Sequence, residues 1–87
     1  MNITILYTLN TPADRDIDYL KRKLADERIE PRLLNADSRE GIALAELYEV
    51  VQRPAVLVTD RDGRLAQKWQ GMIPPVQEVR NAYHSGQ

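Results

Sequence analysis

The residues of this chain that are best placed to do chemistry form one short stretch near the amino terminus: Thr11, Pro12, Ala13 and Asp14. Elsewhere the choice is narrow, because the 87-residue chain has no cysteine and a single histidine, His84. The missing cysteine excludes a thiol nucleophile, a thiolate metal site and a disulfide within the chain. The lone histidine removes most metal sites and the Ser-His and Cys-His catalytic pairs. We therefore predict no catalytic residue, no metal and no cofactor.

The simplest interpretation of this stretch is structural. Thr11 is a good helix cap, Pro12 suits the first helical position because its missing N–H needs no partner there, and Asp14 would reach back to the cap. Such a capping box stabilises a helix by about 1 kcal/mol and requires no function.

The elements on either side must hold this stretch in place, and hydrophobic periodicity predicts them. Strands are expected over residues 3–8, 32–35, 55–59 and 65–70, and helices over about 13–28, over 38–50 and after Pro75. The first helix should bury Ile17, Leu20 and Leu24, which recur at helical spacing. The expected apolar stripe of the second helix is Leu44, Leu47, Tyr48 and Val51. Gly41 is expected to weaken its first turn slightly.

The predicted order is β-α-β-α-β-β-α, in one domain over residues 1–87. A parallel βαβ unit comes first, and a hairpin that turns at Asp60 to Gly63 comes later. We therefore expect an α/β fold in which a four-stranded mixed sheet is flanked by helices on both faces.

This order and three local signatures resemble the thioredoxin superfamily in its glutaredoxin-sized form. The signatures are the strand-to-helix junction at residues 7–14, the stretch 35–58 in which a proline opens the third strand, and the Asp-Gly turn that leads to Gly71. Together they cover nearly the whole chain. In thioredoxins and glutaredoxins the junction holds two cysteines, and in this chain Thr11 and Asp14 occupy their places.

Thiol–disulfide exchange needs a thiolate that attacks a sulfur atom, and neither Thr11 nor Asp14 provides one. The resemblance therefore implies a redox-inactive relative with a cis peptide bond before Pro54. The groove that it implies is lined by Asn10, Arg53, Pro54, Gly71 and Met72. In the family, the residue before this proline offers main-chain hydrogen bonds to an extended partner chain. Our first hypothesis is thus a protein- or peptide-binding module, with the charge of Arg53 favouring acidic partners.

The alternative is an enzyme or small-ligand binder that uses Thr11 and Arg53. In arsenate reductases an Arg-Pro pair also precedes this strand and its arginine helps to hold an oxyanion, so Arg53 and the N–H groups of the helix start would do so here. Acidic residues at that helix start oppose this role because they repel an anion. We favour a pairing of Arg53 with a nearby acid, or a solvated side chain.

Two further hypotheses remain. Glutathione binding rests on a weak motif match, because only the proline and one glycine of the glutaredoxin pattern are present. A structural subunit would instead dimerise through an edge strand or a helix face.

The charge and hydropathy of the chain limit the kinds of partner that we expect. The formal net charge is −1 with both signs interspersed, and no basic patch indicates nucleic acid. No apolar run approaches the roughly 18 residues of a membrane-spanning helix, and the first residues lack the features of a secretory signal. We expect a cytoplasmic protein, a monomer or weak dimer, that binds neither nucleic acid nor membrane.

Overall fold

The computed structural model of the protein describes residues 1–85. Its elements, in chain order, are β1 (Asn2–Tyr7), α1 (Asp14–Ala25), β2 (Arg32–Asn35), α2 (Arg39–Leu47), β3 (Ala55–Thr59), β4 (Leu65–Gln70) and α3 (Val76–Ser85). The strands form one mixed sheet in the order β2-β1-β3-β4. β1 runs parallel to β2, whereas β3 is antiparallel to both β1 and β4. The predicted element order and the mixed sheet are confirmed.

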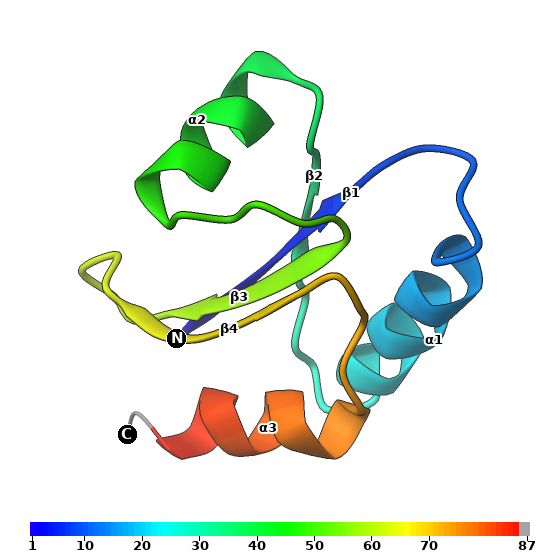
Figure 1. The fold of residues 1–87 in the computed structure, drawn as a ribbon. Coiled ribbons are helices and arrows are strands. Elements are labelled where there is room, and N and C mark those ends of the chain that lie inside the picture. The colour runs from blue at the N-terminus through cyan, green and yellow to red at the C-terminus, as the bar shows by residue number, and fades with distance from the viewer. Residues whose placement is uncertain (86–87) are drawn as a thin grey trace.

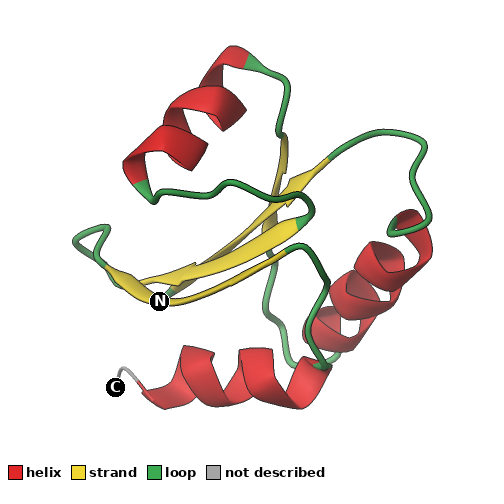
Figure 2. Ribbon diagram, in the orientation of Figure 1, coloured by secondary structure: helices red, strands yellow, loops and turns green. Residues whose placement is uncertain are grey.

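Helices cover both faces of this sheet, with α1 and α3 on one face and α2 on the other (Figure 1, Figure 2). Because successive strand residues point to opposite faces, the central strands divide their apolar side chains between two cores. Ile5 and Val56 belong to the core under α1 and α3. Leu6 and Leu57, their neighbours in sequence, belong to the core under α2.

The core under α1 and α3 is the larger one. Its buried members are Ile3, Ile5, Ile17, Leu20, Leu24, Ile29, Val56, Val58 and Val79. The three helical positions predicted from the spacing in the first helix are among them. Trp69 is half-buried and packs against this cluster from β4. This face of the sheet is therefore closed by side chains from two helices.

The core under α2 is smaller, and its buried members are Leu6, Leu34, Ala36, Ala55 and Leu57. The prediction that Leu47 and Val51 face this core is wrong, because their exposed fractions are 68% and 82%. The helix ends at Leu47, and Glu49 then adopts a left-handed backbone with φ of 55°. The N–H of Val50 donates to the carbonyl of Ala45 and closes this turn. Helical spacing therefore no longer applies at Val51.

The start of α2 lies directly against the end of β2. Ser38 is its N-cap, and its side chain accepts a hydrogen bond from the N–H of Gly41 at 3.0 Å. A Cβ atom on Gly41 would lie 2.1 Å from the main-chain oxygen of Asn35, so only glycine permits this approach. The sequence suggests a small weakness at Gly41, and the structure shows a packing requirement instead.

The first helix is shorter at both ends than predicted. At its carboxyl end, Arg28 has a φ of 61° and the N–H of Ile29 donates to the carbonyl of Leu24, so the chain leaves the helix after Ala25. This turn buries Ile29 against the larger core. At its amino end the helix begins at Asp14, and that start belongs to the candidate site.

Candidate functional site

Several segments leave the sheet at the same end. Leu6 near the end of β1 pairs with Ala55 at the start of β3, and Ala55 pairs with Gln70 at the end of β4. The loop after β1, the segment before β3 and the segment after β4 therefore begin or end side by side (Figure 1). β1 begins and α3 ends toward the opposite end of the sheet. The residues predicted for the groove all belong to these segments.

The segments before β3 and after β4 are joined directly. The N–H of Gly71 donates to the carbonyl of Pro54 at 2.8 Å, and the peptide bond between Arg53 and Pro54 is cis. Gly71 has a φ of 83°, a conformation that favours glycine. A Cβ atom on Gly71 would lie 2.4 Å from the side-chain oxygen of Gln52. Both the backbone angle and the close neighbour thus favour glycine at this position.

The loop from β1 to α1 is built differently from the capping box predicted for it. Ala13 occupies the cap position with helical backbone angles, and no side chain caps this end. The hydroxyl of Thr11 donates to the carbonyl of Thr8 at 3.4 Å, and the carbonyl of Thr11 accepts from the N–H of Asp14 at 3.1 Å. Residues 11–13 form a turn before the helix, so Pro12 precedes the helix and the predicted box is wrong.

The positive charge of Arg53 is paired with an acidic side chain of the same protein. Its guanidinium Nη1 lies 2.5 Å from Oδ1 of Asp37, and both side chains remain about half exposed. The predicted pairing of Arg53 with a nearby acid is confirmed. Asp14 and Asp16 add negative charge to the first turn of α1. In residues 1–85, none of the hydrogen bonds or ion pairs joins Thr11 to Arg53. The arrangement gives an anion little positive charge to bind.

Asp14 of the predicted junction and two residues of the predicted groove, Arg53 and Met72, line three separate hollows. Asp14 lines one of about 210 Å³ beside β1 and β2, and Met72 lines one of about 300 Å³ between α1 and the segment before α3. Arg53 lines a third, of about 410 Å³, against α2. Asn10 and Gly71 are exposed, and Met72 is 52% exposed. The sheet end thus presents shallow surfaces beside one another.

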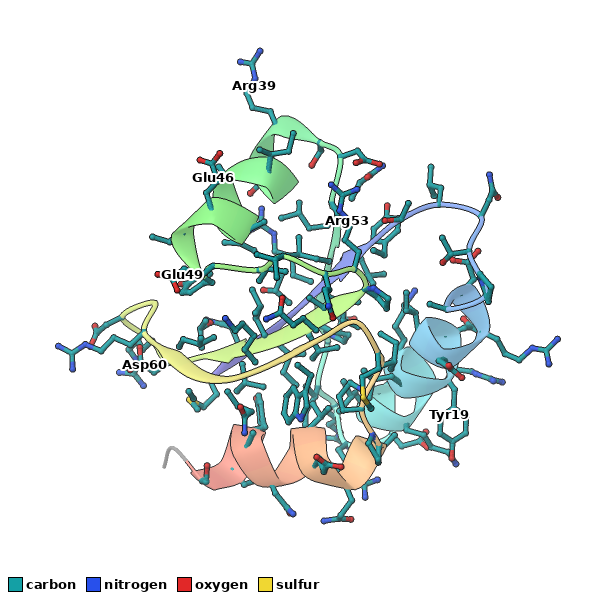
Figure 3. All side chains as sticks on the ribbon, viewed as in Figure 1. Tyr19, Arg39, Glu46, Glu49, Arg53 and Asp60 are labelled. Carbon is teal, nitrogen blue, oxygen red and sulfur yellow. The ribbon has the colours of Figure 1, made fainter. Side chains whose placement is uncertain are left out.

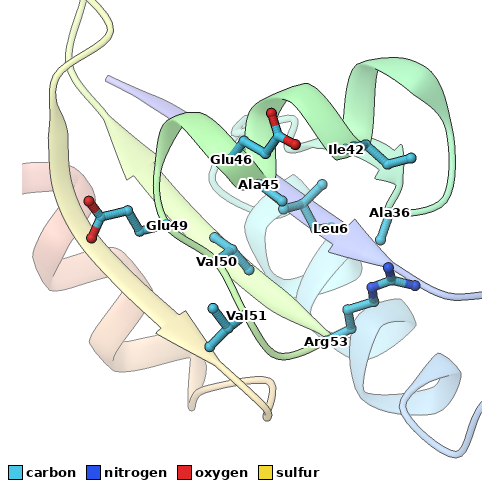
Figure 4. A pocket seen from close by; sticks show the side chains of 9 residues that line it. All are labelled: Leu6, Ala36, Ile42, Ala45, Glu46, Glu49, Val50, Val51 and Arg53. Carbon is cyan, nitrogen blue, oxygen red and sulfur yellow. The ribbon is translucent and has the colours of Figure 1, made fainter.

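The hollow against α2, called the α2 hollow below, was not predicted from the sequence (Figure 4). Its lining residues are Leu6, Ala36, Ile42, Ala45, Glu46, Glu49, Val50, Val51 and Arg53. Glu46, Glu49 and Arg53 all lie on the α2 side of the sheet, whereas Tyr19 lies on the side of α1 (Figure 3). One sequence signal points to this region: the apolar pair Val50-Val51 follows the second helix and precedes Gln52 and Arg53.

Two other kinds of site, a metal site and a membrane span, have no support in the described residues. Across residues 1–85, no group of three or more histidine, cysteine or acidic side chains is placed to hold a metal ion. Within the same range, none of the helices has the length and apolar character needed to cross a membrane.

Comparison with solved structures shows the fold. Thioredoxin 1 from Thermosipho africanus TCF52B matches with a TM-score of 0.72 and 13% identity, over 99% of this chain and 93% of that chain. A disulphide-isomerase-like protein from Bacteroides thetaiotaomicron matches with a TM-score of 0.69 and 14% identity, over 95% and 76%. No family model matches the sequence, and no curated protein matches it.

The protein therefore has a thioredoxin-like fold, as its sequence signatures indicate. It carries that fold without cysteine, so Thr11 and Asp14 replace the Cys-x-x-Cys motif. The 87 residues contain no thiol for disulfide exchange.

Proposed function

We propose that this protein is a redox-inactive, thioredoxin-like binding module that holds an extended segment of a partner protein. The proposed site is the sheet end where Arg53 and Pro54 meet Gly71 and Met72. The observation that carries the proposal is the exposed segment of residues 51–53, which hydrogen bonds from Gln70 hold in place at this end.

This main chain is held in place while part of it stays unpaired. The side-chain oxygen of Gln70 accepts the N–H groups of Val51 and Gln52 at 2.7 and 3.1 Å, and Gly71 binds the carbonyl of Pro54. Across residues 1–85, the main-chain N–H and carbonyl of Arg53 have no hydrogen-bond partner. An extended peptide adds main-chain hydrogen bonds to groups of this kind.

Exposed apolar side chains also lie on the segments that meet at this sheet end. Leu9, Val51 and Met72 are 62%, 82% and 52% exposed, and each belongs to one of the converging segments. Large apolar side chains that stay in water commonly mark contact surfaces when they gather together. The alternative of an anion site receives less support, because Arg53 is paired with Asp37 and the start of α1 is acidic.

A peptide selection followed by NMR mapping tests this function. Peptides selected from a random phage-displayed library on the immobilised protein are titrated into ¹⁵N-labelled protein, and amide shifts are expected at Arg53, Gly71 and Met72. Met72→Asp should weaken binding by roughly tenfold, because it removes apolar contact area. Leu65→Asp is the matched control, since Leu65 is also partly exposed but lies at the other end of β4.

Two outcomes contradict the proposal. Equal losses in the two variants, or amide shifts that leave Arg53, Gly71 and Met72 unmoved, would place binding elsewhere. An insulin-reduction assay should stay at the rate of buffer alone, and turnover above that rate would overturn the redox-inactive assignment.

A further inference from the structure

The α2 hollow has an apolar floor of a size that suits a side chain. Leu6 and Ala36 from the sheet side, with Ala45 and Val50 from α2 and the turn after it, surround a volume of about 410 Å³ (Figure 4). Ile42 and Val51 extend this surface toward solvent and are 48% and 82% exposed. The hollow is open, so a side chain can enter without a rearrangement of the fold.

The rim of the α2 hollow carries two carboxylates without an ion-pair partner. Glu46 and Glu49 are exposed, and neither carboxylate forms an ion pair within residues 1–85. Lys68 brings one positive charge to this end of α2, where its ammonium donates to the main-chain carbonyls of Tyr48 and Glu49 at 3.1 and 3.2 Å and pairs with neither carboxylate. The positive charge of Arg53, on the other side of the hollow, is matched by Asp37.

We infer that the α2 hollow binds a basic peptide segment, with one aliphatic side chain on the apolar floor and Lys or Arg side chains paired with Glu46 and Glu49. The inference rests on the proposed function and names the class of partner. The charge of this partner is opposite to the one that Arg53 alone suggests, because Arg53 is paired with Asp37 whereas neither glutamate has an ion-pair partner within residues 1–85.

Two physical arguments favour a basic segment over an acidic or neutral one. Glu46 lies in the last turn of α2, where the helix dipole adds partial negative charge and favours cations. A Leu- or Ile-sized side chain gains apolar contact area on this floor, and a purely polar ligand does not. An acidic peptide would meet both carboxylates without relief from Arg53.

Three short peptides with blocked ends test the inference by NMR titration of the whole chain. The first has one leucine flanked by lysines, the second has serine in place of the leucine, and the third has glutamates in place of the lysines. The first peptide is expected to shift the amides of Ala36, Ala45 and Val50, and added salt should weaken it. The other two are expected to bind at least about fivefold more weakly.

A matched pair of double variants isolates the two carboxylates. Glu46→Gln with Glu49→Gln should weaken the leucine–lysine peptide by about fivefold or more, since two exposed ion pairs are lost. Glu30→Gln with Glu78→Gln makes the same change in net charge at exposed sites outside the α2 hollow, and should weaken binding less than twofold. Denaturation curves of both variants confirm that they remain folded.

Any one of four results overturns the inference. They are no shift with the leucine–lysine peptide, equal binding of the serine peptide, tighter binding of the glutamate peptide, and equal losses of binding in the two double variants. If library-selected peptides shift Arg53, Gly71 and Met72 while Ala36 and Ala45 stay unmoved, the inference fails and the proposed function stands. If they shift only the hollow, the proposed main-chain site fails.

Discussion

The two faces of the sheet differ in how completely they are covered. Two helices close one face over nine buried side chains, and these include Leu20 and Leu24, which are 1% and 0% exposed. One short helix covers the other face over five buried side chains. That helix also leaves Ile42 and Leu47 in water, at 48% and 68% exposed.

This difference separates the larger core of a small protein from the surface proposed to bind a partner. The face under α1 and α3 holds the larger set of buried apolar side chains, and burial of apolar area is the main source of folding free energy. The face under α2 keeps a hollow and exposed apolar side chains, which add little stability in isolation and are of the kind that marks contact surfaces. The proposed binding features accordingly lie on the less covered face and at the adjoining sheet end.

The largest effects should come from the two cores, probed with the same truncation. Leu24→Ala is expected to lower the free energy of unfolding by about 4 kcal/mol, near the upper part of the range for buried leucine. Leu57→Ala should cost less, about 2–3 kcal/mol, because Leu57 borders a surface hollow and water can enter the space. Urea denaturation measures both. A larger loss for Leu57→Ala would contradict the comparison of the two faces.

An intermediate effect is expected where α2 meets β2. In an exposed helix, Gly→Ala stabilises by about 1 kcal/mol. Gly41→Ala should instead destabilise by about 1–3 kcal/mol, because the new methyl group meets the main-chain oxygen of Asn35. Ala43→Gly, at an exposed position of the same helix, measures the difference in helix propensity between alanine and glycine without a change in packing. Thermal unfolding that shows Gly41→Ala to be stabilising would disprove this close approach.

The smallest effects concern the two helix starts. Ser38→Ala should cost about 1 kcal/mol, because it removes the cap of α2. Thr11→Ala should change stability by less than about 0.5 kcal/mol, because α1 has no side-chain cap. Paired denaturation curves measure the difference. Equal losses would restore the capping interpretation of Thr11.

Local signals were sufficient to predict most of the fold. The apolar run at Ala55–Thr59 predicts a buried strand, and it is the strand with every residue buried. The spacing of Ile17, Leu20 and Leu24 predicts the buried face of α1. The hairpin turn near Gly63 follows from an Asp-Gly pair between two strands, and Gly63 has the positive φ that such a turn uses.

The candidate site could not be predicted in the same way, because it depends on how elements meet. Thr11 and Asp14 have the composition of a capping box, yet the chain turns before the helix and the hydroxyl points back to Thr8. The α2 hollow lies under a helix whose placement depends on the close approach of Gly41 to Asn35 and whose last residue, Leu47, comes before Val51. Neither this close approach nor the end of the helix produces a periodic pattern of residues in the sequence.

The positions of the start of β1 and of the last turn of α3 have a practical consequence. Asn2 at the start of β1 pairs with Thr59 at the end of β3, so β1 starts at the end of the sheet that is remote from Arg53. The last turn of α3 lies toward the same end (Figure 1). A tether attached before β1 or after α3 would therefore leave the opposite end of the sheet unobstructed. Anchored to a solid support or fused to a carrier, the protein would present its proposed binding surface outward.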